Sequence, residues 1–290
     1  MVDLRWQDGP DDALRLLRDG VLAADLAVGN GVEAVNTPKP HLHPLRTPGG
    51  TVVTGFAPED HRWHHGLQFA MPRVGDHNLW GGGTYLNPDE GYRVLPDQGE
   101  IRHLGWSDRQ EGAQAAVTER TRWLGHEGEP LLDETRQWRF SAPEVGEAPA
   151  LVIDFATELR SATGSAVPLQ TPAQRGRPDG GYGGLFLRLA EDFELAGIDD
   201  ELVESGGSAR TMVVRGRIGG APVTLGFAFL DGPTPGDRFW LHRFAPFCAV
   251  GWAIAYQQGL EVPADQPVVI QHRLLLADGL LDPEAVRRLL

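Results

Sequence analysis

Hydrophobic and polar residues alternate with a period of two along most of the chain. The segment 150–161, ALVIDFATELRS, is the clearest case, with Leu151, Ile153 and Phe155 on one side. Such alternation is typical of a strand with one buried face. The same pattern predicts strands in 115–125, 131–141, 185–190, 209–218, 221–230, 238–244 and 267–277.

Turn residues separate these segments throughout the sequence. The chain contains 37 glycines and 22 prolines, in groups such as DGG, IGGAP and DGPTPGD. Short strands joined by such turns are typical of antiparallel sheets. We therefore predict an all-β chain that forms one domain over residues 1–290, a large antiparallel two-sheet sandwich.

Helix signals are few. The segment 9–20, GPDDALRLLRDG, fits either a short helix or a strand after a turn. The C-terminal segment LDPEAVRRLL is clearer, because Asp282 suits an N-cap, Pro283 the first helical position and Glu284 the first turn. A short C-terminal helix is predicted there.

Charge and composition narrow the range of partners. The net charge is −14, from 26 basic and 40 acidic residues, so nucleic acid is not an expected partner. The apolar stretch 244–256 is too short to span a bilayer, and the acidic N-terminus lacks a signal peptide. We expect a soluble, cytoplasmic protein with no membrane partner, while the sequence leaves homo-oligomerisation open.

Histidines are concentrated in the segment 41–67, HLHPLRTPGGTVVTGFAPEDHRWHHGL, which contains five of the ten. His41 and His43 share a face if the backbone is extended, and His61, His64 and His65 follow in HRWHHG. Apolar residues between them indicate structured backbone. Because imidazole both titrates near neutral pH and binds metals, we predict that these rings face one cavity. His43, His64 and His65 are the predicted catalytic groups, with His41 and His61 as ligand contacts.

A carboxylate candidate lies within a predicted strand. Glu134 shares a face with Leu132, Trp138 and Phe140. A carboxylate buried there must be paired or functional, because burying it alone is costly. Glu134 is therefore a candidate acid–base residue, and pairing with a neighbouring arginine is the alternative.

Further candidates are predicted to contact a ligand. Trp80 precedes the glycines 81–83, which allow backbone to approach a ligand, and its ring suits either stacking on a sugar or core packing. The remaining predicted contacts are polar or aromatic groups near turns or within apolar strands, namely Arg46, Tyr182, Arg243 and His272.

Several motifs carry a family resemblance. The stretches HPLRTPGGTVVT, WHHGL, VGDHNLWGGGTY, GYGGLFLR and HRLLLADG resemble the soluble family labelled methane oxygenase PmoA, over nearly the whole chain. The enzyme subunit behind that label is an integral membrane protein, and this chain has no membrane-spanning segment, so the label is not taken as a function. The resemblance implies a role in carbohydrate catabolism, since members often accompany sugar-oxidising dehydrogenases and sugar-uptake systems.

The pair HHGL and NLW has a looser resemblance to aldose 1-epimerases. That likeness implies a galactose mutarotase-like β-supersandwich, with a histidine that protonates the ring oxygen at His64 or His65. It also implies a glutamate far downstream, whereas the last 80 residues offer only Glu261 and Glu284. The resemblance therefore supports the β-supersandwich architecture more strongly than it supports mutarotase chemistry.

Three functions remain open from the sequence. The first is a hydrolase, lyase or epimerase that acts on a sugar or sugar-derived acid and requires no cofactor. The second is a cupin-like enzyme in which His41, His43 and one of His61, His64 or His65, with His64 as the first choice, bind a divalent metal. The third is a carbohydrate-binding module without catalysis.

Overall fold

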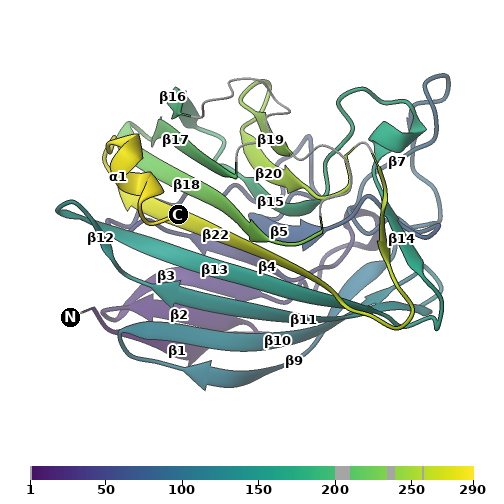
Figure 1. Cartoon of the computed structure of the whole chain (residues 1–290), viewed down its shortest axis with the longest axis horizontal. Helices are drawn as coiled ribbons and strands as arrows, with labels where there is room; N and C mark the ends of the chain where they lie inside the picture. The colour runs from purple at the N-terminus through teal and green to yellow at the C-terminus, as the bar shows by residue number, and fades with distance from the viewer. Residues whose placement is uncertain (1, 200–209, 234–238, 257) are drawn as a thin grey trace.

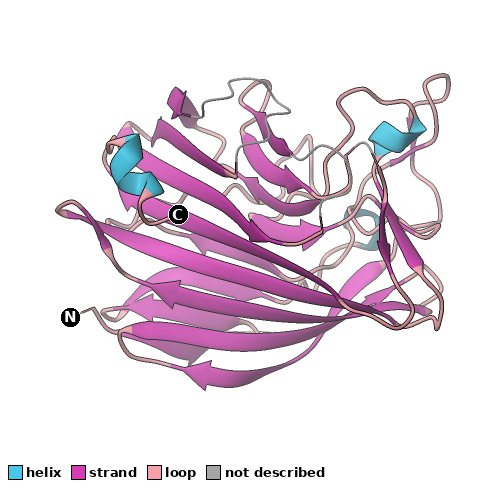
Figure 2. Ribbon diagram, viewed as in Figure 1, coloured by secondary structure: helices cyan, strands magenta, loops and turns pink. Residues whose placement is uncertain are grey.

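The computed structural model describes residues 2–199, 210–233, 239–256 and 258–290. Strands dominate it, and helices are confined to short segments (Figure 2). The named strands in these ranges pair antiparallel and form two large sheets (Figure 1). The prediction of an all-β sandwich is therefore confirmed.

The first sheet contains the histidine segment and most of the N-terminal strands. Its strand order is β1 (Leu4–Asp8), β2 (Leu14–Arg18), β3 (Val21–Ala27), β4 (His41–Leu45), β5 (Leu67–Ala70), β15 (Gly184–Arg188), β20 (Ala249–Ala253) and β19 (Phe239–Arg243). The segment 9–20 contributes β2, so a strand rather than a helix forms there.

The second sheet contains the longest strands. Its order is β16 (Phe193–Asp199), β17 (Thr211–Ile218), β18 (Ala221–Asp231), β22 (Val268–Asp278), β13 (Ala148–Ser161), β11 (Pro130–Ser141), β10 (Gln114–Leu124) and β9 (Glu100–Gln110), and β12 (Glu144–Val145) pairs with β13. Two smaller sheets flank them: β21 (Leu260–Val262), β14 (Val167–Gln170) and β6 (Arg73–Val74), then β7 (Thr84–Tyr85) and β8 (Tyr92–Arg93).

Aromatic rings from the two large sheets meet in the core. Phe69 on β5 packs against Trp123 on β10 and Phe155 on β13, with ring centroids 6.0 and 5.6 Å apart. Phe229 on β18 stacks on Trp252 of β20 at 4.4 Å. Trp123, Phe155 and Phe229 lie in segments where the period of two predicts strands, whereas Phe69 and Trp252 lie in short strands that the alternation did not predict. Burial of their apolar area holds the sheets face to face.

The predicted C-terminal helix is confirmed as α1 (Pro283–Arg287). The Asp282 carboxylate caps it by accepting a hydrogen bond from the Ala285 N–H at 3.3 Å. Val286 packs on the outer face of the second sheet, against Val152 and Leu275. The helix therefore buries strand positions that alternation alone assigns to solvent.

Two of the sequence motifs contact each other. In the TPGG turn after β4, the Thr47 hydroxyl donates to Asp278 Oδ1 and the Gly49 N–H donates to Asp278 Oδ2, each at 2.6 Å. Asp278 belongs to the HRLLLADG motif at the end of β22. A Cβ at Gly49 would lie 2.8 Å from that carboxylate, so the glycine makes room for it. These motif residues join the two sheets.

None of the helices in the described ranges has the length and apolar character that crossing a bilayer requires. Two short 3-10 helices, η1 (Ala34–Asn36) and η2 (Pro172–Arg175), lie in loops.

Candidate functional site

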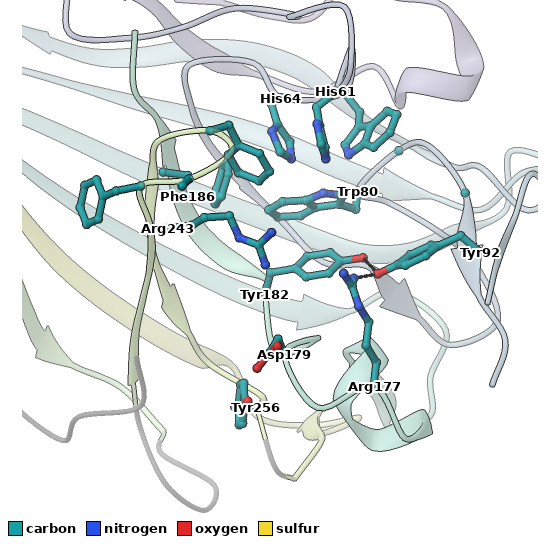
Figure 3. Close-up of a pocket in the computed structure, with 17 residues that line it drawn as sticks. His61, His64, Trp80, Tyr92, Arg177, Asp179, Tyr182, Phe186, Arg243 and Tyr256 are labelled. Atoms are coloured by element: carbon teal, nitrogen blue, oxygen red, sulfur yellow. Dashed lines mark hydrogen bonds between the residues drawn. The ribbon is translucent and has the colours of Figure 1, made fainter. Parts of the chain in front are cut away.

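A cavity of about 780 Å³ opens where loops cover β15, β19 and β20 of the first sheet (Figure 3). Four segments build most of its wall: the loop before β5, the loop before β7, the loop after η2 and the segment around β19 and β20. Its lining residues are His61, Trp63, His64, Trp80, Gly81, Gly83, Tyr92, Arg177, Asp179, Tyr182, Phe186, Arg243, Phe244, Ala245, Phe247, Ala249 and Tyr256.

The structure separates the five clustered histidines into two groups. His61 and His64 line the cavity, with stacked rings whose centroids lie 4.7 Å apart. His41, His43 and His65 surround Phe56 instead, with ring centroids 5.0–5.2 Å from its ring. The prediction that all five rings face one cavity is therefore wrong.

Local backbone geometry explains the separation. The His64 N–H donates to the His61 carbonyl at 2.9 Å, and this turn brings the two rings together. His65 forms an extended bridge with Phe56, so its side chain points away from that of its neighbour His64. Gly66 follows with φ of +55°, and a Cβ there would lie 2.2 Å from the Leu42 carbonyl oxygen. The HHG motif thus needs its glycine for close approach to β4.

The His64 ring is buried among aromatic side chains at one end of the cavity. Its centroid lies 4.8 Å from that of Phe186 and 5.9 Å from that of Trp80. Its Nδ1 has no hydrogen-bond partner among the described residues. Burial, followed by the charges of nearby basic groups, lowers the pKa of His64 well below its ordinary value of 6.5. The ring is therefore neutral at neutral pH and can accept a proton.

A carboxylate lies beside the neighbouring ring. His61 Nδ1 lies 2.8 Å from Asp60 Oδ2. Although desolvation acts to raise it, the contact with His61 lowers the pKa of Asp60. The two adjacent imidazoles thus differ in environment, one beside a carboxylate and the other in an aromatic pocket.

Two buried polar side chains fix the position of Trp80. The Lys39 ammonium donates to the Trp80 carbonyl at 2.9 Å and to the carbonyls of Asn36 and Thr37 at 3.1 Å each. Asn78 Oδ1 accepts from the Trp80 and Gly81 N–H groups at 2.9 Å each. The sequence did not predict these roles of Lys39 and Asn78. Lys39 stands out in the sequence only as the single lysine of the chain.

The triple glycine serves packing as well as the cavity wall. A Cβ at Gly81 would lie 2.5 Å from the Trp63 Cβ, and one at Gly82 would lie 2.8 Å from the Trp63 ring. Both glycines also have positive φ, at +106° and +69°. They are therefore required chiefly by the approach of Trp63 and by the backbone conformation, and only secondarily by access to a ligand.

Tyrosines and charged groups lie on the other side of Trp80 from the imidazoles (Figure 3). The Tyr182 ring centroid is 5.0 Å from that of Trp80, and its hydroxyl oxygen lies 3.0 Å from that of Tyr92. Arg177 donates to the Tyr92 hydroxyl. Arg177 and Asp179 belong to the RPDGGYGG turn, from which the sequence predicted only Tyr182. The glycine-rich turn identified this segment as a candidate, but no local feature of the sequence indicated that Arg177 and Asp179 would face the cavity.

Arg243 adds a second guanidinium to the lining. Its Cζ lies 5.3 Å from the centroid of the Phe247 ring. The Cζ of Arg188, a buried residue, lies 4.3 Å from the same centroid. Arg188 thus places a further positive charge close behind the wall, and its closest described carboxylate contact is Asp60 at 4.0 Å.

Three further predicted site residues, in addition to His41, His43 and His65, lie outside the cavity lining. Arg46 donates to the Gly50 carbonyl at 2.8 Å within the turn after β4. His272 is buried between the sheets, 5.5 Å from Phe229 by ring centroids. Glu134 is buried in the second sheet, and its carboxylate is occupied by neighbouring side chains. The structure gives these three positions packing or turn contacts in place of a cavity contact.

The histidines predicted first as alternative metal ligands, His41, His43 and His64, do not come together either. His41 Nδ1 lies 2.9 Å from the Lys39 carbonyl oxygen, and His43 Nδ1 lies 2.9 Å from the Thr54 hydroxyl. His64 lines the cavity, apart from both. Within the described ranges, these three are not among the side chains whose ligand atoms converge closely enough to share an ion.

Comparison with known families places the chain. A family described as a family of unknown function (DUF6807) matches residues 13–290. The chain belongs to the DUF6807 family. No curated protein matches it. The match covers β2 to α1, so the DUF6807 region includes all four segments of the cavity wall.

Buried histidines make the DUF6807 chain sensitive to mild acid. Burial lowers the pKa of His41 to about 4 and that of His272 to about 3, and it lowers the pKa of His64 and His65 as well. Below pH 6.5 the unfolded chain takes up these protons and the folded chain does not, so stability falls as pH falls. We expect His41 and His272 together to remove about 3 kcal/mol of unfolding free energy between pH 7.5 and 5.5.

Urea denaturation at a series of pH values measures this loss. His272→Phe, which removes one titrating ring from an aromatic site, should flatten the profile by about 1.4 kcal/mol over the same interval. A profile without slope between pH 7.5 and 5.5 would contradict the prediction.

Proposed function

We propose that the chain is an enzyme that acts on a carbohydrate bearing a carboxylate, with His64 as the proton-transferring group. The observation that carries the proposal is the neutral, buried imidazole of His64 in a cavity that also contains Arg177 and Arg243. His61, which lies beside Asp60, would serve as a second proton carrier.

The size and lining of the cavity suit a sugar. Small-molecule sites usually have volumes of about 300–1,000 Å³ and combine aromatic walls with a few polar groups. The volume of about 780 Å³ falls within that range, and Trp80, Tyr182 and Tyr92 supply rings and hydroxyls. Aromatic faces pack against the apolar faces of sugar rings, while hydroxyls orient them.

Charge favours an acidic substrate. Among the described lining residues, Arg177 and Arg243 face one acid, Asp179, while Arg188 lies behind the wall with Asp60 at 4.0 Å. This local excess of positive charge contrasts with a net charge of −14 for the chain. Guanidinium groups bind carboxylates in bidentate fashion, so the arginines would select a sugar acid over a neutral sugar.

The proposed chemistry requires one proton acceptor near the bound carboxylate. A neutral imidazole can remove a proton from the carbon beside the carboxylate. Return of a proton to the opposite face of that carbon gives the epimer, and departure of the oxygen substituent on the next carbon, which takes up a proton as it leaves, gives the elimination product. The imidazole can instead activate water for hydrolysis. All three reactions need the same group, and none of them needs a cofactor for the proton transfer.

A matched ligand panel tests the proposal. Uronates, aldonates and keto-sugar glycosides would be compared with their neutral parent sugars by isothermal titration, and turnover would be followed by NMR. We expect a uronate to bind about 10-fold or more tightly than the neutral parent, because a hydrogen bond to a charged group contributes about 1.5–3 kcal/mol. Arg243→Gln should abolish this preference.

Arg160→Gln is the control variant for Arg243→Gln. Arg160 is an exposed arginine that pairs with Glu158 at 2.7 Å, away from the cavity lining. It should leave the preference unchanged. Equal affinity for acid and neutral sugars would contradict the substrate class. Tight binding of sugar acids without turnover of any would favour the carbohydrate-binding module over the enzyme.

A further inference from the structure

Two histidines and a glutamate converge outside the cavity, between two turns. His77 lies in the turn after β6, and His126 and Glu129 lie in the turn that joins β10 to β11. One potential ligand atom of each lies within 4.8 Å of the others. None of the three lines the cavity, so their arrangement is not explained by the proposed function.

The two imidazoles face each other through their Nδ1 atoms, which lie 3.2 Å apart. In a tetrahedral site with metal–nitrogen bonds of 2.0–2.1 Å, two ligand nitrogens are about 3.3–3.4 Å apart. The observed separation is therefore close to one edge of such a site. The ring centroids are 5.3 Å apart, and the planes are tilted by 35°.

The groups around His77 determine which of its ring nitrogens carries the proton and which can bind a metal. Its Nε2 lies 3.1 Å from Glu129 Oε1, and its Nδ1 accepts the backbone N–H of His126 at 3.4 Å. His77 therefore carries its proton on Nε2, and its Nδ1 lone pair, which accepts the long contact from the His126 N–H, is the one that a bound metal would take in place of that contact. A carboxylate that accepts from the outer nitrogen of a metal-binding imidazole fixes the tautomer and raises the basicity of the ligand.

The turn holds Glu129 in place for this role. The Gly125 N–H donates to the Glu129 carbonyl at 2.9 Å, and Glu129 Oε2 accepts from the Glu127 N–H at 3.0 Å. A Cβ at Gly125 would lie 2.4 Å from the Glu129 carboxyl carbon, so the glycine leaves space for the carboxylate to fold back. The hairpin is therefore shaped around this carboxylate.

We propose that His77 and His126 bind a divalent transition-metal ion through their Nδ1 atoms, with Glu129 orienting His77 from behind. Imidazole nitrogens favour Zn²⁺, Cu²⁺ and Ni²⁺ over Mg²⁺ and Ca²⁺. Water completes the coordination, because the His126 side chain is 38% exposed. The ion would join the turn after β6 to the β10–β11 hairpin.

The site also adjoins the loop that carries Trp80. His77 directly precedes Asn78, which accepts the N–H groups of Trp80 and Gly81. A metal at His77 would therefore anchor the segment that forms one wall of the cavity, without contacting a substrate.

Metal titration of the untagged full chain tests the proposal. After dialysis against a chelator, isothermal titration with Zn²⁺ should give one equivalent bound, and Cu²⁺ should give an electron paramagnetic resonance spectrum with hyperfine coupling to two imidazole nitrogens. Glu129→Gln should weaken Zn²⁺ binding by about 10–100-fold, as removal of an orienting group does. His126→Gln should weaken it further and leave coupling to at most one nitrogen.

His64→Phe provides the matched control, because it removes a histidine from the other imidazole pair. It should bind Zn²⁺ as the wild type does, and circular dichroism melts would confirm that each variant is folded. Sub-stoichiometric binding, or binding unchanged in folded His126→Gln, would overturn the site. Loss of Zn²⁺ binding in His64→Phe would also overturn it, by moving the ion to the cavity. These outcomes do not depend on whether a sugar acid is turned over.

Discussion

His64→Phe is expected to lower kcat by about 10²–10⁴-fold, the usual contribution of a positioned proton-transfer group. Phenylalanine keeps a ring in the aromatic pocket beside Phe186 and Trp80 but has no nitrogen that accepts a proton. The KM for the same substrate should change much less than kcat, because binding rests on the arginines and tyrosines. The measurement is steady-state kinetics with the best sugar acid from the panel.

A second measurement separates catalysis from structure. Since His64 must be neutral to accept a proton and burial lowers its pKa, the acidic limb of kcat should lie below pH 6.5. His65→Phe is the control, because His65 is the adjacent histidine and its ring packs against Phe56 outside the cavity. It should keep wild-type kcat. A large loss of kcat in a normally folded His65→Phe variant, or wild-type kcat in His64→Phe, would contradict the assignment of His64 as the proton-transferring group.

Glu134→Ala is expected to lower the free energy of unfolding by about 3–5 kcal/mol, the usual effect of removing one partner of a buried ion pair. The carboxylate accepts from Thr121, Trp123 and Thr157 at 2.6–2.7 Å. It also accepts from Arg136 Nε at 2.8 Å. Without it, the buried guanidinium of Arg136 loses its carboxylate and three donors lose their acceptor. Urea denaturation midpoints would measure the change.

Glu158→Ala is the matched control on the adjacent strand. Glu158 pairs with Arg160 at 2.7 Å, but both side chains are partly exposed, so the loss should stay below about 1 kcal/mol. The double variant Glu134→Leu/Arg136→Met should regain part of the stability, because it also removes the buried charge of Arg136, although Thr121, Trp123 and Thr157 still lack their acceptor. If Glu134→Gln instead kept stability and lost turnover, Glu134 would be the acid–base residue that the sequence suggested.

The strand segments could be predicted because their signal is local. In β13, alternate residues such as Leu151, Ile153 and Phe155 are buried, as the period of two predicts. Ala150 and Val152 are the exceptions, since they are buried in the cluster that α1 forms on the outer face. When an element distant in the sequence covers the outer face of a strand, the hydrophobic alternation of that strand does not reveal it.

The site was predicted in part, for the same reason. Trp80, Tyr182 and Arg243 line the cavity with His61 and His64, as the sequence suggested. The sequence could not separate these rings from those of His41, His43 and His65, because the separation depends on one turn and one bridge to Phe56.

The sequence by itself determined the antiparallel strands, the capped C-terminal helix and the segments that carry polar and aromatic candidates. Each of these follows from a local feature, either the period of two in hydrophobicity along a strand or a capping residue next to its helix. Only the tertiary structure decided which imidazoles share a cavity, that Glu134 lies in the core and that His77 meets His126. Those facts depend on contacts between residues tens of positions apart, and such contacts are fixed by how the sheets pack.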